Sequence, residues 1–318
     1  MPKGKFFFWV VVLFTARPLG LSPLSSEELN YLLNHYARSG NFQGMKELLN
    51  KFLAEFPDDP ELLFLRGLAN SRTARYGEAL IDFTRALENT KDKSRVLLER
   101  AKVHYQRDSY SEALEDFSQA IEIDPKNAAA YNSRGNLKYD LRDYVGALVD
   151  FSQAIEIDPK NAAAYNSRGN LKYDLRDYVG ALADFSRAVE IDPNYAVAYY
   201  NRGDANRELR NLTAALTDYN RAIELNSEYA NAYNNRGNIK RTLKDYGGAL
   251  ADFSRAIEIN PEHADAYFNR GNVKHELNDY EGALVDYLQA HKLRPENQNY
   301  LQRIEELTNR LEDQAGAR

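Results

Sequence analysis

The sequence contains no cysteine among its 318 residues. This absence excludes disulfide bonds, thiolate nucleophiles, cysteine-ligated zinc, iron–sulfur clusters and a lipid anchor attached to cysteine. It does not identify the redox compartment, because a chain directed to export can simply avoid cysteine. Tryptophan occurs once, at Trp9, so a chain that lost its first residues would contain none.

The sequence also lacks a strong excess of charge of one sign. Its 41 Lys and Arg against 47 Asp and Glu give a net charge of -6. A mildly acidic chain lacks the basic surface of nucleic-acid-binding proteins, so no nucleic-acid partner is expected. A charged fraction of 28% and a mean hydropathy of -0.63 exclude a multi-span membrane protein, and a hydrophobic fraction of 43% argues against a wholly disordered chain.

Long apolar runs are missing as well. The longest begins at Phe6 and ends at Phe14, which is short of the roughly 20 residues that cross a bilayer as a helix. Lys3 and Lys5 precede it, as in a secretory signal peptide. We expect residues 1–25 to be a signal peptide, or a short anchor that keeps the chain near a membrane, plus a linker. The protein is then exported, periplasmic or extracytoplasmic. If this segment is an ordinary apolar arm, the protein is cytoplasmic.

The rest of the chain is one repeat. Residues 116–148 are identical to residues 150–182, an offset of 34. A full unit spans 128–161, and its positions are numbered 1 to 34 here. Apolar residues at positions 3, 4, 10 and 14 predict a first helix, and those from Tyr144 to Ile155 predict a second. Asp158-Pro159 then ends the second helix, because proline cannot continue it. Neither helix can bury its apolar face alone, so the units must stack.

This unit resembles the tetratricopeptide repeat (TPR). That family's pattern places small residues at positions 8, 20 and 27, aromatic residues at 17 and 24, and Pro at 32. Seven units here carry Ala at position 20 (Ala79, Ala113, Ala147, Ala181, Ala215, Ala249 and Ala283), and the same seven carry Phe or Tyr at position 24. The resemblance implies an all-α, right-handed superhelical solenoid of helix-turn-helix repeats.

The expected organisation is eight repeats and a cap. Repeat 1 is degenerate, because Leu33, Met45, Leu49 and Phe52 replace the family's residues there, and it should be looser at its helix crossing. After residue 297 an amphipathic helix should cover the open end of the stack. The repeats are 26–59, 60–93, 94–127, 128–161, 162–195, 196–229, 230–263 and 264–297, followed by a capping helix and tail at 298–318.

No motif for catalysis is present. Five histidines are spread over four repeats without metal-ligand spacing, and GxSxG, HExxH and phosphate-binding glycine loops are absent from the sequence. Carboxylates recur with the repeat period, which favours a structural role. We therefore expect no enzymatic activity, no metal and no cofactor.

Arginine at position 7 and aspartate at position 23 recur together in the same seven repeats. The two positions lie at the same height of a hairpin that turns near position 15. The pattern favours an Arg–Asp pair in each hairpin or between neighbours. The alternative is an arginine ladder for an anionic ligand.

Asparagines provide the better candidate site. In TPR stacks positions 2, 5, 6, 9, 12 and 13 of the first helix line the concave groove. An Asn amide can donate and accept, so evenly spaced amides can hold the backbone of an extended peptide. The row is similar to the asparagine ladder of O-linked N-acetylglucosamine transferases, whose catalytic domain is missing here. Larger or charged side chains that interrupt the row would confer selectivity for particular peptides. The alternative is that these amides are only solvated on an open surface and bind no ligand. The candidate residues are Asn132, Asn136, Asn166, Asn170, Asn201, Asn234, Asn235, Asn238, Asn269 and Asn272, with Tyr200, Arg207, Arg241 and Phe268 interrupting the row.

The carboxylate clamp of heat-shock cochaperones is absent, because position 5 is never Lys and position 6 is never Arg. The expected function is a non-catalytic scaffold or adaptor that binds an extended segment of a protein or peptide partner in the groove. Two alternatives remain: a structural component of a cell-envelope assembly that uses the convex face or the solenoid ends, and a regulatory module that accompanies an enzyme.

Overall fold

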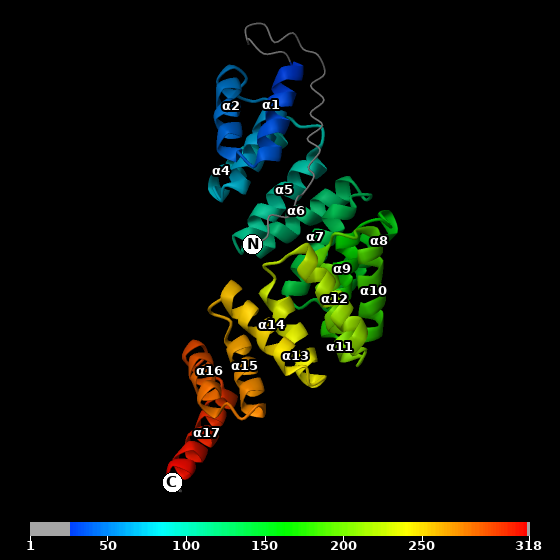
Figure 1. Ribbon diagram of the computed structural model, residues 1–318. Coiled ribbons are helices and arrows are strands. Elements are labelled where there is room, and N and C mark those ends of the chain that lie inside the picture. The colour runs from blue at the N-terminus through cyan, green and yellow to red at the C-terminus, as the bar shows by residue number, and fades with distance from the viewer. Residues whose placement is uncertain (1–25, 317–318) are drawn as a thin grey trace. The chain divides into compact units, whose positions relative to one another are not determined.

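A computed structural model describes residues 26–316, which form seventeen helices and no strand (Figure 1). Its contacts separate two compact units, one that ends at Pro159 and one that begins at Lys160. The predicted signal peptide or anchor, residues 1–25, lies outside the described residues. Across 26–316, none of the helices combines the length and the apolar character needed to cross a membrane.

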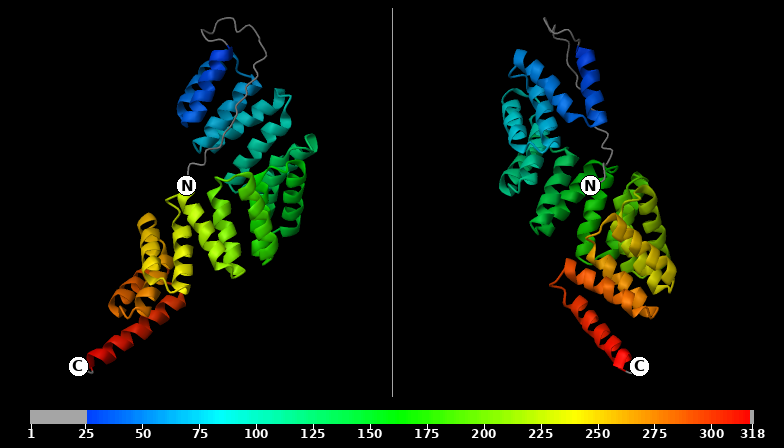
Figure 2. Two further views of the ribbon diagram at one scale, coloured as in Figure 1. Left: turned by 45° about the vertical axis from the view of Figure 1, so that its right-hand side comes forward. Right: turned by 60° about the vertical axis from the view of Figure 1, so that its left-hand side comes forward.

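Successive helices in each unit pair as hairpins, and Figure 2 shows these hairpins stacked one after another. The helices of unit 1 are α1 (Ser26–Ser39), α2 (Phe42–Glu55), α3 (Pro60–Arg72), α4 (Tyr76–Asn89), α5 (Lys93–Gln106), α6 (Tyr110–Ile123), α7 (Ala128–Asp140) and α8 (Tyr144–Ile157). Those of unit 2 are α9 (Ala162–Asp174), α10 (Tyr178–Ile191), α11 (Ala196–Glu208), α12 (Leu212–Leu225), α13 (Ala230–Thr242), α14 (Tyr246–Ile259), α15 (Ala264–Glu276), α16 (Tyr280–Leu293) and α17 (Gln298–Gly316). The predicted all-α arrangement of tandem helix-turn-helix repeats is confirmed.

The turn inside each hairpin has one backbone geometry. The residue at position 15 is left-handed, with φ of 64° at Lys244 and 70° at Gly40. The next residue caps the second helix, and the Asp245 carboxylate accepts a 2.9 Å hydrogen bond from the Gly248 amide. A left-handed residue therefore ends the first helix of each hairpin, and in five hairpins the side chain of the next residue caps the second helix: Asn41, Asp143, Asp177, Asp245 and Asp279.

The hairpin core repeats with the sequence. Ala249 and Ala256 are buried on either side of Phe253, whose ring lies against Gly237 of the partner helix. Small residues allow the two helices to approach closely, and the aromatic ring fills the remaining space. In the first hairpin, larger buried side chains replace this set, and α1 and α2 approach each other less closely than the later pairs do.

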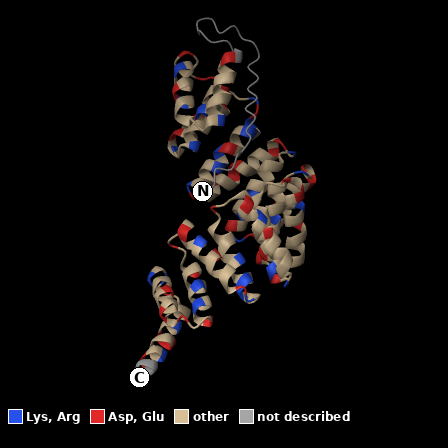
Figure 3. Cartoon of the chain, in the orientation of Figure 1, with Lys and Arg blue, Asp and Glu red and all other residues tan. Residues whose placement is uncertain are grey.

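The last helix, α17, packs on α16. Ile304 and Leu311 contact the α16 core as the amphipathic pattern predicts, and Leu307 is buried there. Tyr300, which the pattern missed, is also buried and contacts Ala290. Figure 3 shows Lys and Arg interspersed with Asp and Glu along the helices of both units.

Candidate functional site

A buried ion pair joins the two helices of every hairpin from the second to the eighth. Arg236 approaches Asp252 with both of its facing nitrogens, Nη2 to Oδ1 at 2.6 Å and Nε to Oδ2 at 2.9 Å. This bidentate contact confirms the Arg–Asp interpretation, and it leaves the seven guanidinium groups engaged rather than free for an anionic ligand. The pairs are Arg66–Asp82, Arg100–Asp116, Arg134–Asp150, Arg168–Asp184, Arg202–Asp218, Arg236–Asp252 and Arg270–Asp286.

The same arginine also contacts the preceding hairpin. Arg236 Nη1 donates a 2.7 Å hydrogen bond to Asn220 Oδ1 on α12. Lys240 Nζ lies 2.9 Å from Asp252 Oδ2 and adds a second cation to the buried carboxylate. These networks therefore hold the helices of a hairpin together and join neighbouring hairpins.

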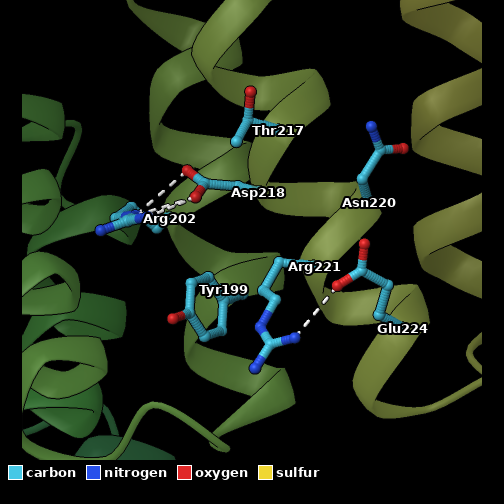
Figure 4. Close-up of a pocket in the computed structure, with 7 residues that line it drawn as sticks. All are labelled: Tyr199, Arg202, Thr217, Asp218, Asn220, Arg221 and Glu224. Carbon is cyan, nitrogen blue, oxygen red and sulfur yellow. Dashed lines mark hydrogen bonds and ion pairs between the residues drawn. The ribbon is translucent and has the colours of Figure 1, made fainter.

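A shallow pocket of about 360 Å³ lies beside one such pair, between α11 and α12 (Figure 4). Its charged side chains already have partners, since Arg202 contacts Asp218 and Arg221 lies 3.0 Å from Glu224. The pocket is thus part of the repeated structural network. It is lined by Tyr199, Arg202, Thr217, Asp218, Asn220, Arg221 and Glu224.

The candidate asparagines of unit 2 hydrogen-bond to one another across neighbouring repeats. We call the side chains at positions 5, 6 and 9 of α9, α11, α13 and α15 the asparagine face. Asn201 Nδ2, at position 6 of α11, donates to Asn166 Oδ1 and Asn170 Oδ1 on α9, both at 2.9 Å. The amide at position 6 therefore bridges positions 5 and 9 of the preceding repeat.

The other two position-6 asparagines point the same way. Asn269 Nδ2 on α15 donates to Asn234 Oδ1 on α13 at 3.0 Å. Asn235 Nδ2 on α13 donates to the Tyr200 hydroxyl oxygen at 3.0 Å and to Asp204 Oδ1 at 2.9 Å. In all three repeats the NH2 group faces the previous repeat.

Two of the asparagines at position 9 also accept hydrogen bonds in this network. Asn170 Oδ1 accepts the hydrogen bond from Asn201 Nδ2, and Asn272 Oδ1 accepts a 2.9 Å hydrogen bond from the Tyr287 hydroxyl. Asn238 is half-buried, and its side-chain amide makes no hydrogen bond within the described part of the chain. Position 5 is the most enclosed, since Asn166 and Asn234 are 6% and 7% exposed. The less buried amides of the asparagine face are therefore those at positions 6 and 9.

Asp204 is a site residue that sequence reasoning missed. It occupies position 9 of α11, where repeats 4, 5, 7 and 8 have Asn, and this exchange was the signal available in the sequence. Its Oδ1 accepts a 2.6 Å hydrogen bond from the Tyr219 hydroxyl and lies 3.6 Å from Arg207 Nη2. Burial raises the pKa of the Asp204 carboxyl above its ordinary 3.8, against the opposing effect of Tyr219, Arg207, Tyr200 and Asn235.

The two aromatic interruptions share one arrangement. The Tyr200 ring lies 4.9 Å from Tyr229, and Phe268 lies 4.7 Å from Tyr300, centroid to centroid. Each also contacts the position-24 Tyr of its own hairpin, Tyr219 or Tyr287. These rings are half-buried or buried, and they make repeats 6 and 8 the apolar parts of the asparagine face.

The predicted arginines lie at position 12, next to acids. Arg207 Nη2 lies 2.9 Å from Glu208, and Arg241 Nε lies 4.0 Å from Glu276. The remaining candidates, Asn132 and Asn136, lie half-buried on α7 of unit 1. Across the described residues, His, Asp and Glu form no group of three or more that could hold a metal ion.

Family models match most of the chain. The model described as TPR repeat matches residues 101–142, 135–176, 169–209 and 203–240. Two models described as tetratricopeptide repeat match 32–94, and 230–263 with 264–297. No curated protein sequence matches the chain.

Several solved structures are similar. YrrB, described as a TPR protein with an unusual peptide-binding site, is 27% identical with a TM-score of 0.50, over 58% of this chain and 96% of YrrB. Pseudomonas aeruginosa PilF is 17% identical with a TM-score of 0.61, over 66% of this chain and 96% of PilF. A chain of the APC/C hetero-tetramer Cut9–Hcn1 is 14% identical with a TM-score of 0.66, over 89% of this chain and 56% of its own. The last two likenesses concern the fold alone.

Proposed function

The chain belongs to the tetratricopeptide repeat family, and from this premise we propose that it is a non-catalytic scaffold that binds an extended protein segment along the asparagine face. TPR proteins generally mediate protein–protein interactions, and YrrB is described as having a peptide-binding site. The similarity to the asparagine ladder of O-linked N-acetylglucosamine transferases remains a prediction from the sequence.

The observation that carries the proposal is the fixed orientation of the amides. The NH2 groups of Asn201 and Asn269 donate hydrogen bonds to the preceding repeat, so the Oδ1 atom of each remains available as an acceptor. Asn170 and Asn272 use Oδ1 as an acceptor, so each keeps Nδ2 as a donor. A peptide backbone offers one donor and one acceptor per residue, which matches this set.

The spacing also suits an extended chain. Packed helices lie about 8–10 Å apart and an extended peptide advances about 3.3 Å per residue, so each repeat would meet about three residues of the bound segment. Because the network holds the amides in place before binding, little side-chain entropy is lost when a peptide binds.

A second candidate function uses the convex side, in a structural assembly of the cell envelope. It is favoured by exposed valines on second helices: Val145 and Val149 on α8 are 78% and 62% exposed, and Val179 on α10 is 68% exposed. Substituting these valines by Ser would abolish assembly in this case and leave peptide binding intact.

The decisive variant for groove binding is Asn238→Ala. Because its amide makes no hydrogen bond among the described residues, its loss should leave stability nearly unchanged and weaken peptide binding. Asn309→Ala, an exposed asparagine on α17, is the matched control. Affinity for displayed random peptides is measured by fluorescence polarisation after circular dichroism shows equal helicity. Equal affinity of both variants and the parent would contradict the proposal.

We also propose that residues 1–25 direct the chain to export. The support is the basic start and short apolar run of the sequence. Fractionation of the native host, with the chain detected by mass spectrometry, tests this. Recovery only from the cytoplasmic fraction would argue for an ordinary N-terminal arm.

A further inference from the structure

Asp204 breaks the donor pattern of the asparagine face. Asn170 and Asn272 present an NH2 donor at position 9, whereas the Asp204 carboxylate can only accept. A peptide that follows the face therefore meets a different chemical group in repeat 6. This difference singles out one point of the bound segment.

The Asp204 carboxylate keeps some capacity to accept. A carboxylate can accept about four hydrogen bonds, and three neutral donors reach this one: Tyr219 and Asn235 on Oδ1, and the Tyr200 hydroxyl. The contact with Arg207 also ends on Oδ1, and 15% of the side chain is exposed. An enclosed anion that can still accept favours a further donor, above all a charged one.

The surrounding charges favour a cation. Arg207 lies 3.6 Å from Asp204 and 2.9 Å from Glu208, so one guanidinium is shared by two carboxylates and the trio is negative. The Tyr200 ring precedes Asp204 by one turn of α11, and the Tyr200 hydroxyl shares the Asn235 donor with Asp204.

We propose that Asp204 is a specificity-determining residue that receives a Lys or Arg side chain of the bound protein segment. This inference rests on the proposed binding of an extended segment along the asparagine face. The cation contacts the Asp204 carboxylate and lies beside Tyr200, while the amides of the neighbouring repeats hold the backbone. An anionic side chain is disfavoured there by Asp204 and Glu208.

Repeat 8 provides a matched design. Asn272 accepts a hydrogen bond from Tyr287 as Asp204 does from Tyr219, and Phe268 stands where Tyr200 does. Asn272→Asp should therefore create a second carboxylate of the same kind, and Asp204→Asn should remove the first. At about three peptide residues per repeat, the double variant should shift the basic preference by about six residues.

The experiment selects displayed random peptides on the full chain and its variants, at low and high salt. We expect Lys or Arg at one position, favoured about tenfold over Ala, with the preference lost in Asp204→Asn and shifted in the double variant. Bound peptides without a basic preference, or a preference that Asp204→Asn retains, would overturn this inference and leave the proposed function standing. If the chain bound no peptide at all, this result would contradict both the inference about Asp204 and the proposed function.

Discussion

The Tyr219 hydroxyl donates a 2.6 Å hydrogen bond to Asp204 Oδ1. Two repeats later the Tyr287 hydroxyl makes the equivalent 2.9 Å bond to Asn272 Oδ1. The protein thus contains the same buried site with a charged and with a neutral acceptor.

Asp204→Asn should stabilise the fold at pH 7 by about 1 kcal/mol, because an amide accepts the same hydrogen bonds without a buried charge. Burial raises the pKa of Asp204 in the folded state above its ordinary 3.8. The folded state therefore loses stability as the pH rises through that raised pKa, and regains it as the pH falls. The advantage of the variant should shrink toward pH 4 in urea unfolding. A constant advantage across this range would show that Asp204 does not titrate as described.

Removing one partner of a buried ion pair should have the opposite effect and lower the free energy of unfolding. Asp252→Asn leaves Arg236 and Lys240 without their carboxylate, and we expect a loss of about 3–5 kcal/mol. Glu258→Gln on the same helix breaks an exposed pair with Arg255 and should leave the free energy of unfolding nearly unchanged. Urea unfolding of both variants compares the pairs directly. Similar small losses would mean that the buried pair is no more important than the exposed one.

Two glycines in neighbouring helices should respond oppositely to alanine. A Cβ at Gly237 would lie 2.8 Å from Phe253 Cε1, so Gly237→Ala should cost about 1–3 kcal/mol. A Cβ at Gly247 meets nothing within 4 Å, so Gly247→Ala should gain up to about 1 kcal/mol through helix propensity. The midpoint of thermal unfolding should fall in Gly237→Ala and rise in Gly247→Ala relative to the parent. Repeat 3 has Ala101 at the equivalent position, where it is buried, so a Cβ is accommodated there in one hairpin; the cost of Gly237→Ala should be at the low end of this range if the Phe253 ring can shift.

The sequence predicted the hairpin ion pairs because positions 7 and 23 belong to one hairpin and their heights follow from helix geometry. It did not predict the bond between Asn201 and Asn166, because that contact depends on how neighbouring hairpins pack. Asp204 was missed for a different reason. A repeat pattern emphasises what the units share, and selectivity depends on the residue in which one unit differs.

His263 lies at the start of α15, at a position where three other repeats have Asn. Asn127 and Asn161 each accept a 3.0 Å hydrogen bond from the amide three residues later. His263 makes no such cap, and its Nε2 is buried without a hydrogen-bond partner among the described residues. His263→Asn should therefore stabilise the protein by about 1 kcal/mol.

The stabilisation by His263→Asn should be larger at low pH. Burial lowers the pKa of His263 below its ordinary 6.5, with Asp265 opposing this effect and Arg294 adding to it. Below pH 6.5 the unfolded chain binds a proton that the folded His263 does not, so the parent loses stability as the pH falls toward the lowered pKa. The variant lacks this loss. Urea unfolding at pH 7.5 and pH 5 should show a larger difference between parent and variant at pH 5. A difference that stays constant would indicate that the cap alone is responsible.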